Sequence, residues 1–146
     1  MQSPSTLQIL EYGPPISLDL AKKVMAAAEA ESLANRWPMA VAIVDSTGHL
    51  VLLQKLDQAQ YGSIAVAQSK AETAVNFRRP TKVFEDAIAA GGVGTRLLSI
   101  NNACSVEGGI PLILDGKVVG GIGVSGMHSS HDAQVAMAGA NALTRA

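Results

Sequence analysis

The chain has 146 residues, of which 48% are hydrophobic and 16% are charged, and its formal net charge is −1 at pH 7. A chain of this length favours one domain with a buried core, and the composition is too apolar for intrinsic disorder. The near-neutral charge and the scattered basic residues exclude nucleic acid as an expected partner. No apolar run is long enough to cross a bilayer, so no membrane contact is expected.

Two features of the sequence favour the cytoplasm. The first residues carry neither the basic segment nor the apolar segment of an export signal. Cys104 is the only cysteine, so the chain cannot form an internal disulfide, which agrees with a reducing compartment. Because so small and apolar a chain has few charged groups to cover its surface, we also expect a homo-oligomer that buries apolar surface between subunits.

The N-terminal region divides into an arm and the start of a single domain. We expect residues 1–16 to form the arm, because three prolines deny this stretch helical hydrogen bonds, and residues 17–146 to form one domain. Ser17 is the predicted N-cap of a helix that runs to about Asn35, where a Trp-Pro pair ends it.

The middle of the chain predicts a hairpin followed by two helices. Two short runs rich in branched residues, 39–45 and 50–56, are separated by a turn-like segment and predict the hairpin. From 61 to about 76 the spacing of apolar residues becomes helical. Pro80 ends this helix, and Thr81 is the predicted cap of a second, short helix that a glycine-rich segment stops.

The C-terminal third carries the clearest pattern. An Asp-Gly pair joins the apolar runs 110–114 and 117–125, and such a pair indicates a two-residue hairpin turn because both turn positions need positive φ. A final helix is predicted after the second run. The order helix, hairpin, two helices, hairpin, helix lacks the βαβ alternation of parallel sheets. It therefore predicts an α+β fold, within the broad α/β class, with an antiparallel sheet flanked by helices.

Two glycines, Gly121 and Gly123, occupy one face of the last predicted strand, while branched residues occupy the other face. Glycine inside a strand contributes no side-chain packing, so its presence implies that something approaches the backbone closely. A packed helix is one explanation and a flat ligand is the other. The sequence agrees with both a packed helix and a flat ligand.

The segment after this strand is the best candidate for binding an anion. Ser125 and Gly126 end the strand, and the free N–H groups at the start of the following helix attract carboxylates or phosphates. Ser129 or Ser130 is the predicted cap of that helix. Capping by a serine does not exclude binding of a ligand.

Three histidines are candidate ligands of a metal. His128 and His131 are three residues apart and can share one face of the last helix, but no motif supplies a third ligand for a free metal ion. As an axial ligand of haem iron one histidine suffices. His49 lies in the predicted turn of the first hairpin, where it is either an ordinary exposed residue or a further axial candidate.

Other polar residues agree with more than one role, structural or chemical. Arg78 and Arg79 follow a predicted helix and either favour its negative end or bind a ligand carboxylate. Glu107, beside the glycine-rich segment, is either the end of a surface strand or a catalytic acid or base. Cys104 is predicted to be a small buried hydrophobe. No nucleophile elbow, P-loop, dinucleotide fingerprint or zinc spacing appears, so motifs do not establish an enzyme.

Several stretches taken together resemble the GlcG/HbpS-like haem-binding family. The resemblance spans about Ser17 to Leu143, and its motifs are specific in combination although each is weak alone. The same module is similar to the C-terminal domain of PduO-type corrinoid adenosyltransferases, and stand-alone members occur beside genes of glycolate or diol metabolism. The stretches that carry the resemblance are 40–50, 70–81, 108–112, 115–126 and Asp132.

The resemblance implies a profilin-like fold and a homo-oligomer, a tetramer or an octamer, with haem held near subunit contacts. The shared motifs carry over Phe77, Pro80, Thr81 and the loop 123–126 as ligand-site positions. The dipeptide 127–128, Met-His, departs from the small residues expected there, and either fills the pocket or adds an iron ligand. The full set of candidate cofactor-binding positions is His49, Phe77, Arg78, Arg79, Thr81, Gly121, Gly123, Ser125, Gly126, His128 and His131.

These features predict a haem-binding or haem-handling protein that acts as a homo-oligomer with a small-molecule ligand. One alternative is an accessory enzyme of the lyase or isomerase type, or a binding protein, for a small carboxylate such as a hydroxy acid. In that case Arg78 or Arg79 binds the carboxylate and Glu107 is the base. The other alternative is a structural assembly module. The ligand hypothesis depends on an uncovered glycine face next to the start of the last helix, and it fails if the chain's own residues fill that face and no cavity lies at any subunit contact.

Overall fold

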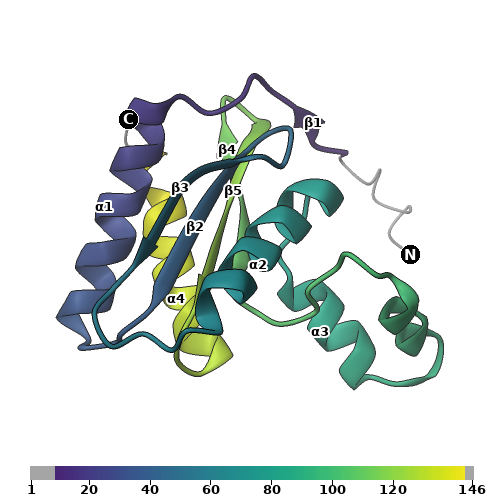
Figure 1. Cartoon of the computed structure of the whole chain (residues 1–146). Coiled ribbons are helices and arrows are strands. Elements are labelled where there is room, and N and C mark those ends of the chain that lie inside the picture. The colour runs from purple at the N-terminus through teal and green to yellow at the C-terminus, as the bar shows by residue number, and fades with distance from the viewer. Residues whose placement is uncertain (1–8, 144–146) are drawn as a thin grey trace, which may run out of the picture.

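A computed structural model describes residues 9–143, and Figure 1 shows their arrangement. Residues 1–8, half of the expected arm, lie outside the described residues. None of the helices in the described range is long and apolar enough to cross a membrane. The elements in chain order are β1 (Glu11–Tyr12), α1 (Leu18–Ala34), β2 (Ala40–Asp45), β3 (Leu50–Lys55), α2 (Ser63–Phe77), α3 (Lys82–Ala89), the 3-10 helix η1 (Gly92–Ser99), β4 (Gly109–Leu114), β5 (Lys117–Ser125) and α4 (Ser129–Asn141).

The strands form one sheet with β5 and β2 at its centre. β2 pairs antiparallel with both β5 and β3, and β4 pairs antiparallel with β5. β1 adds a short parallel pairing at Lys117 and Val118 of β5. The two predicted hairpins are therefore confirmed, as is the α+β fold with an antiparallel sheet flanked by helices. The sequence did not predict β1.

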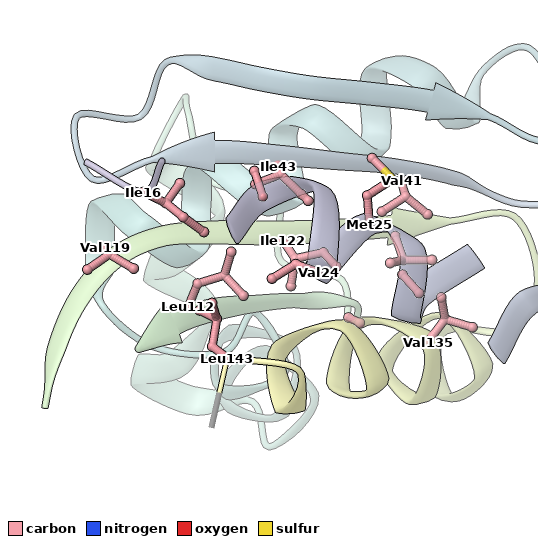
Figure 2. Close-up of a cluster of buried hydrophobic side chains, with 14 of the residues drawn as sticks. Ile16, Val24, Met25, Val41, Ile43, Leu112, Val119, Ile122, Val135 and Leu143 are labelled. Carbon is pink, nitrogen blue, oxygen red and sulfur yellow. The ribbon is translucent and has the colours of Figure 1, made fainter. Parts of the chain in front are cut away.

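Helices cover both faces of the sheet. α1 and α4 pack side by side against one face, and α2 lies across the other (Figure 1). Between this face and the helices α1 and α4 lies a cluster of buried branched side chains that includes Val24, Val41, Ile43, Ile122 and Val135 (Figure 2). Full burial of one such side chain contributes about 1.5–3 kcal/mol, so this cluster is the main source of stability.

Of the helix caps predicted at Ser17 and Thr81, the structure contains the first and lacks the second. The Ser17 side chain accepts a hydrogen bond from the Leu20 N–H at 3.2 Å, which confirms the predicted cap of α1. Thr81 stands at the N-cap position of α3, but its side chain makes no cap. Its hydroxyl instead accepts a hydrogen bond from the Gly109 N–H at 2.9 Å. The predicted Thr81 cap is wrong because β4 takes up this hydroxyl.

The glycine face of β5 is covered by α2. A Cβ added at Gly121 would lie 2.6 Å from the Ala71 carbonyl oxygen, and one added at Gly123 would overlap the Ala67 carbonyl. Ala40 and Ala42 of β2 are also small and buried beneath α2. Small residues on both surfaces let the helix approach the sheet backbone. The packed helix is thus the correct explanation, and the expectation of an uncovered face open to a flat ligand is wrong.

Candidate functional site

The turn between β5 and α4 is held by a carboxylate and not by a serine. α4 begins at Ser129 with His128 at the N-cap position, and no side chain caps it there. Asp132 Oδ1 accepts a hydrogen bond from the Met127 N–H at 3.0 Å. The predicted cap by Ser129 or Ser130 is therefore wrong, because both serines lie inside the first turn of α4 and neither precedes it.

The same carboxylate forms a buried ion pair with α2. Lys70 Nζ lies 3.0 Å from Asp132 Oδ2 and also donates a hydrogen bond to the Val124 carbonyl at 2.8 Å. Burial raises the pKa of Asp132 above its ordinary value, against the opposing effects of the Met127 N–H and the Lys70 charge. The pair joins α2, β5 and α4, so it fixes the backbone from which His128 projects.

Two histidines and a tryptophan meet at this turn. The His131 ring stacks on Trp37, with centroids 4.3 Å apart and planes inclined by 14°. His128 lies edge-on to His131 at a centroid distance of 5.6 Å. His131 Nδ1 is buried and has no hydrogen-bond partner among residues 9–143, whereas the His128 ring is exposed. The structure thus brings together the two histidines that the sequence proposed as iron ligands.

Gly126 explains why Trp37 reaches this turn. A Cβ added at Gly126 would lie 2.5 Å from the Pro38 carbonyl oxygen, so the glycine permits close approach of the two loops. Trp37 also lines an open hollow of about 540 Å³, together with Leu33, Arg36 and Leu56. Trp37 is therefore both a wall of this hollow and the residue that stacks on His131. Neither His128 nor His131 lines the hollow, and Trp37 connects the hollow to the imidazole pair. A hollow with an aromatic wall beside an imidazole pair suits a flat apolar ligand.

The predicted site residues fall into two groups that lie at opposite ends of α2. Ser125 donates a hydrogen bond to Ser63 at 3.2 Å, at the start of α2, whereas Phe77 ends this helix. A helix of 15 residues is roughly 20 Å long, so the two groups form no single site within one chain. His49 belongs to the group at the Phe77 end of α2, because its turn lies near Asn76. Its Nδ1 is 2.7 Å from the Thr47 hydroxyl.

Arg78 and Arg79, at the C-terminal end of α2, make hydrogen bonds within the chain. Arg78 donates a hydrogen bond to the Leu10 carbonyl at 2.8 Å and lies over the Tyr12 ring, so it anchors β1 to α2. Arg79 Nε donates to the Phe77 carbonyl at 3.0 Å. Phe77 packs edge-on to Phe84 with centroids 5.1 Å apart. Arg78 is thus engaged by the chain itself, whereas the exposed Arg79 makes only this local hydrogen bond.

Neither Glu107 nor Cys104 lies within a group of catalytic side chains in the described residues. Glu107 Oε1 is 3.8 Å from Lys82 Nζ, and its N–H donates to Glu85 at 3.3 Å. Burial raises the pKa of the Cys104 thiol, so this thiol stays protonated and weakly nucleophilic at neutral pH. In the described part of the chain, no group of three His, Cys, Asp or Glu residues is placed to bind a metal ion.

Sequence reasoning missed two residues of the site. Trp37 was taken only as part of the signal that ends α1, and no periodicity shows that it stacks on a histidine nearly a hundred positions later. Lys70 was missed although it occupies a helical position between the buried residues Ala67 and Ala71. A lysine on the inward stripe of a helix was the available signal for a buried pair.

Comparison with known proteins agrees with this architecture. The family model described as "Haem degrading protein HbpS-like" matches residues 16–141. Protein GlcG of Escherichia coli strain K12 is 35% identical over 110 residues, which cover 75% of this chain and 81% of GlcG. A double mutant of HbpS from Streptomyces reticuli is similar in structure with a TM-score of 0.82 and 29% identity, over 98% of each chain.

A third relative is a solved complex with haem. The structure named PduOC:Heme Complex has a TM-score of 0.79 and 25% identity, and the match covers 88% of this chain and 94% of the other. The fold places the chain in the class of small α+β proteins that these structures define. The family match covers most of the chain, and the chain belongs to the HbpS-like family.

Proposed function

We propose that this chain binds haem as a cytoplasmic homo-oligomer and that His128 is the axial ligand of the iron. The family description refers to haem degradation, and one structural relative is a haem complex. The observation that carries the proposal is the exposed His128 imidazole beside the stacked pair of His131 and Trp37. No comparable arrangement of an exposed histidine with an aromatic pair surrounds His49 in the described residues.

The residues around the hollow fit the chemistry of haem. Haem is flat and apolar apart from its two propionates, and it supplies an iron that accepts an imidazole nitrogen. Leu33, Trp37 and Leu56 offer apolar walls, and the exposed Arg36 offers a guanidinium for a propionate. The acidic residues Glu29 and Asp57 also line the hollow, so a propionate would have to lie on the Arg36 side. The hollow is open, so a neighbouring subunit is needed to cover the outer face of the porphyrin.

The test is a titration of the purified chain with haemin, followed by the Soret band. We expect a saturable Soret shift in the wild type, a weaker and spectrally altered complex for His128→Ala, and wild-type behaviour for His49→Ala. The His49 variant is the matched control because it removes an exposed imidazole far from the hollow. Absence of a saturable shift above an albumin-like background would overturn haem binding. An unchanged shift in the double variant His128→Ala/His131→Ala would overturn only the histidine ligation.

A further inference from the structure

The outer edge of β3 is an unpaired sheet edge. β3 pairs with β2 on one side, and no strand in the described part of the chain pairs with its other side. The edge strand at the opposite end of the sheet, β4, carries Pro111, which removes one backbone donor, whereas β3 contains no proline. An unprotected edge presents free N–H and C=O groups to another strand.

The regular part of β3 shows which backbone groups are free. The Leu56 N–H donates to the Met39 carbonyl at 2.9 Å, so these two residues form a bonded pair. Bonded pairs alternate along an antiparallel ladder, so Gln54 and Leu52 face β2, while Leu53 and Lys55 turn their backbone groups outward. The Leu53 side chain is 39% exposed.

A hollow of about 310 Å³ lies between this edge and α1. Met25 and Ala26 of α1 line one side of it, and Leu52, Leu53 and Gln54 of β3 line the other. Gln54 Nε2 is buried and has no hydrogen-bond partner among the described residues. A buried amide donor without an acceptor is unfavourable, so the Gln54 side chain gains a hydrogen bond if it turns outward to an acceptor of a docked chain.

Charges on α1 bracket the hollow symmetrically. Lys22 and Glu29 both line it and are separated by about two helical turns, with Met25 and Ala26 between them. Neither residue makes an ion pair within residues 9–143. A two-fold axis through the middle of the hollow would bring Lys22 of each copy to Glu29 of the other copy. The same axis would pass beside Leu53, where two antiparallel β3 edges can exchange backbone hydrogen bonds.

We propose that this α1–β3 face, comprising Lys22, Met25, Ala26, Glu29, Leu53 and Gln54, docks a second copy of the chain around a two-fold axis. The two sheets join edge to edge through β3, and the two α1 helices lie antiparallel with reciprocal ion pairs. The proposal specifies the interface of the homo-oligomer in the proposed function and does not require haem. Glu29 also lines the hollow proposed for haem, so the interface borders that hollow.

A charge-swap experiment on the haem-free protein tests this interface. Wild-type protein is expected to have a mass in solution that is an even multiple of the 15.0 kDa chain. Lys22→Glu places two like-charged pairs across the axis and is expected to weaken the dimer about tenfold or more. Glu29→Lys should act likewise, and the double variant Lys22→Glu/Glu29→Lys should restore the wild-type mass. Sedimentation equilibrium measures each assembly, and circular dichroism confirms that each variant is folded.

A crosslink provides a second measurement that does not depend on weakening the assembly. Ala26→Cys in a Cys104→Ser background places a thiol of each copy near the axis, so mild oxidation should give covalent dimers. Lys23→Cys in the same background is the control on another side of α1. A monomeric wild type, or single charge variants that keep the wild-type mass together with absence of the Ala26→Cys crosslink, would overturn the proposal. Failure of the haemin titration leaves this result unaffected, so the two proposals fail separately.

Discussion

Lys70 Nζ lies 3.0 Å from Asp132 Oδ2, with both side chains almost fully buried and 62 positions apart in the chain. The pair connects the helix that covers one face of the sheet to the helix that covers the other. It also holds the Met127 N–H through the second carboxylate oxygen. Removing two charges from water costs free energy that their attraction only partly returns, so a buried pair of this kind adds little net stability to the fold.

Breaking this pair should be far more harmful than replacing it. Lys70→Met leaves the Asp132 carboxylate buried without its charge partner, and we expect a loss of about 3–5 kcal/mol in the free energy of unfolding. The double variant Lys70→Met/Asp132→Leu should recover most of that loss. Urea denaturation measures both. Lys82→Met, which removes the surface ion pairs of Lys82 with Glu85, Asp86 and Glu107, is the control and should cost no more than about 1 kcal/mol. Equal losses in the single and double variants would contradict this account.

The raised pKa of Asp132 predicts a specific pH dependence of stability. Because the folded state holds this proton more tightly than the unfolded state, the contribution of Asp132 falls as the pH rises from its ordinary pKa of 3.8 to its folded value. The difference in unfolding free energy between wild type and Asp132→Asn should therefore shift against the wild type as pH increases through that window. Urea titrations at several pH values test it. A difference that grows in favour of the wild type would show that the folded pKa is lowered.

The sequence predicted those features that depend on neighbouring residues. The Asp115-Gly116 turn and the Ser17 cap were correct because each is decided within a few positions. The glycine face had two explanations, since only the tertiary partner decides whether a helix or a ligand approaches it. The serine cap of α4 was wrong because the helix begins at Ser129, so both serines lie inside its first turn. Trp37 was missed because its stacking on His131 joins distant parts of the chain.

The close packing of α2 on β5 makes Gly123 intolerant of a side chain. A Cβ there would overlap the Ala67 carbonyl, which is backbone and cannot rotate away. We expect Gly123→Ala to lower the unfolding free energy by about 3 kcal/mol. Gly62→Ala is the matched control, because nothing lies within 4 Å of a Cβ at that position and its φ is −63°. That variant should stay within about 1 kcal/mol of the wild type. A small effect at Gly123 would mean that α2 can move off the sheet.

Trp37 should contribute to haem affinity through its ring and not through any polar group. It lines the hollow and stacks on His131, so Trp37→Ala removes an apolar wall and releases the imidazole, whereas Trp37→Phe keeps a ring in place. We expect Trp37→Ala to weaken haem binding about tenfold, which corresponds to about 1.4 kcal/mol, and Trp37→Phe to have a much smaller effect. Soret titrations measure both affinities. Because Trp37 is the only tryptophan in the chain, quenching of wild-type fluorescence by bound haem gives a second reading. Unchanged affinity in Trp37→Ala, together with unquenched fluorescence at Soret saturation, would place the haem elsewhere on the molecule.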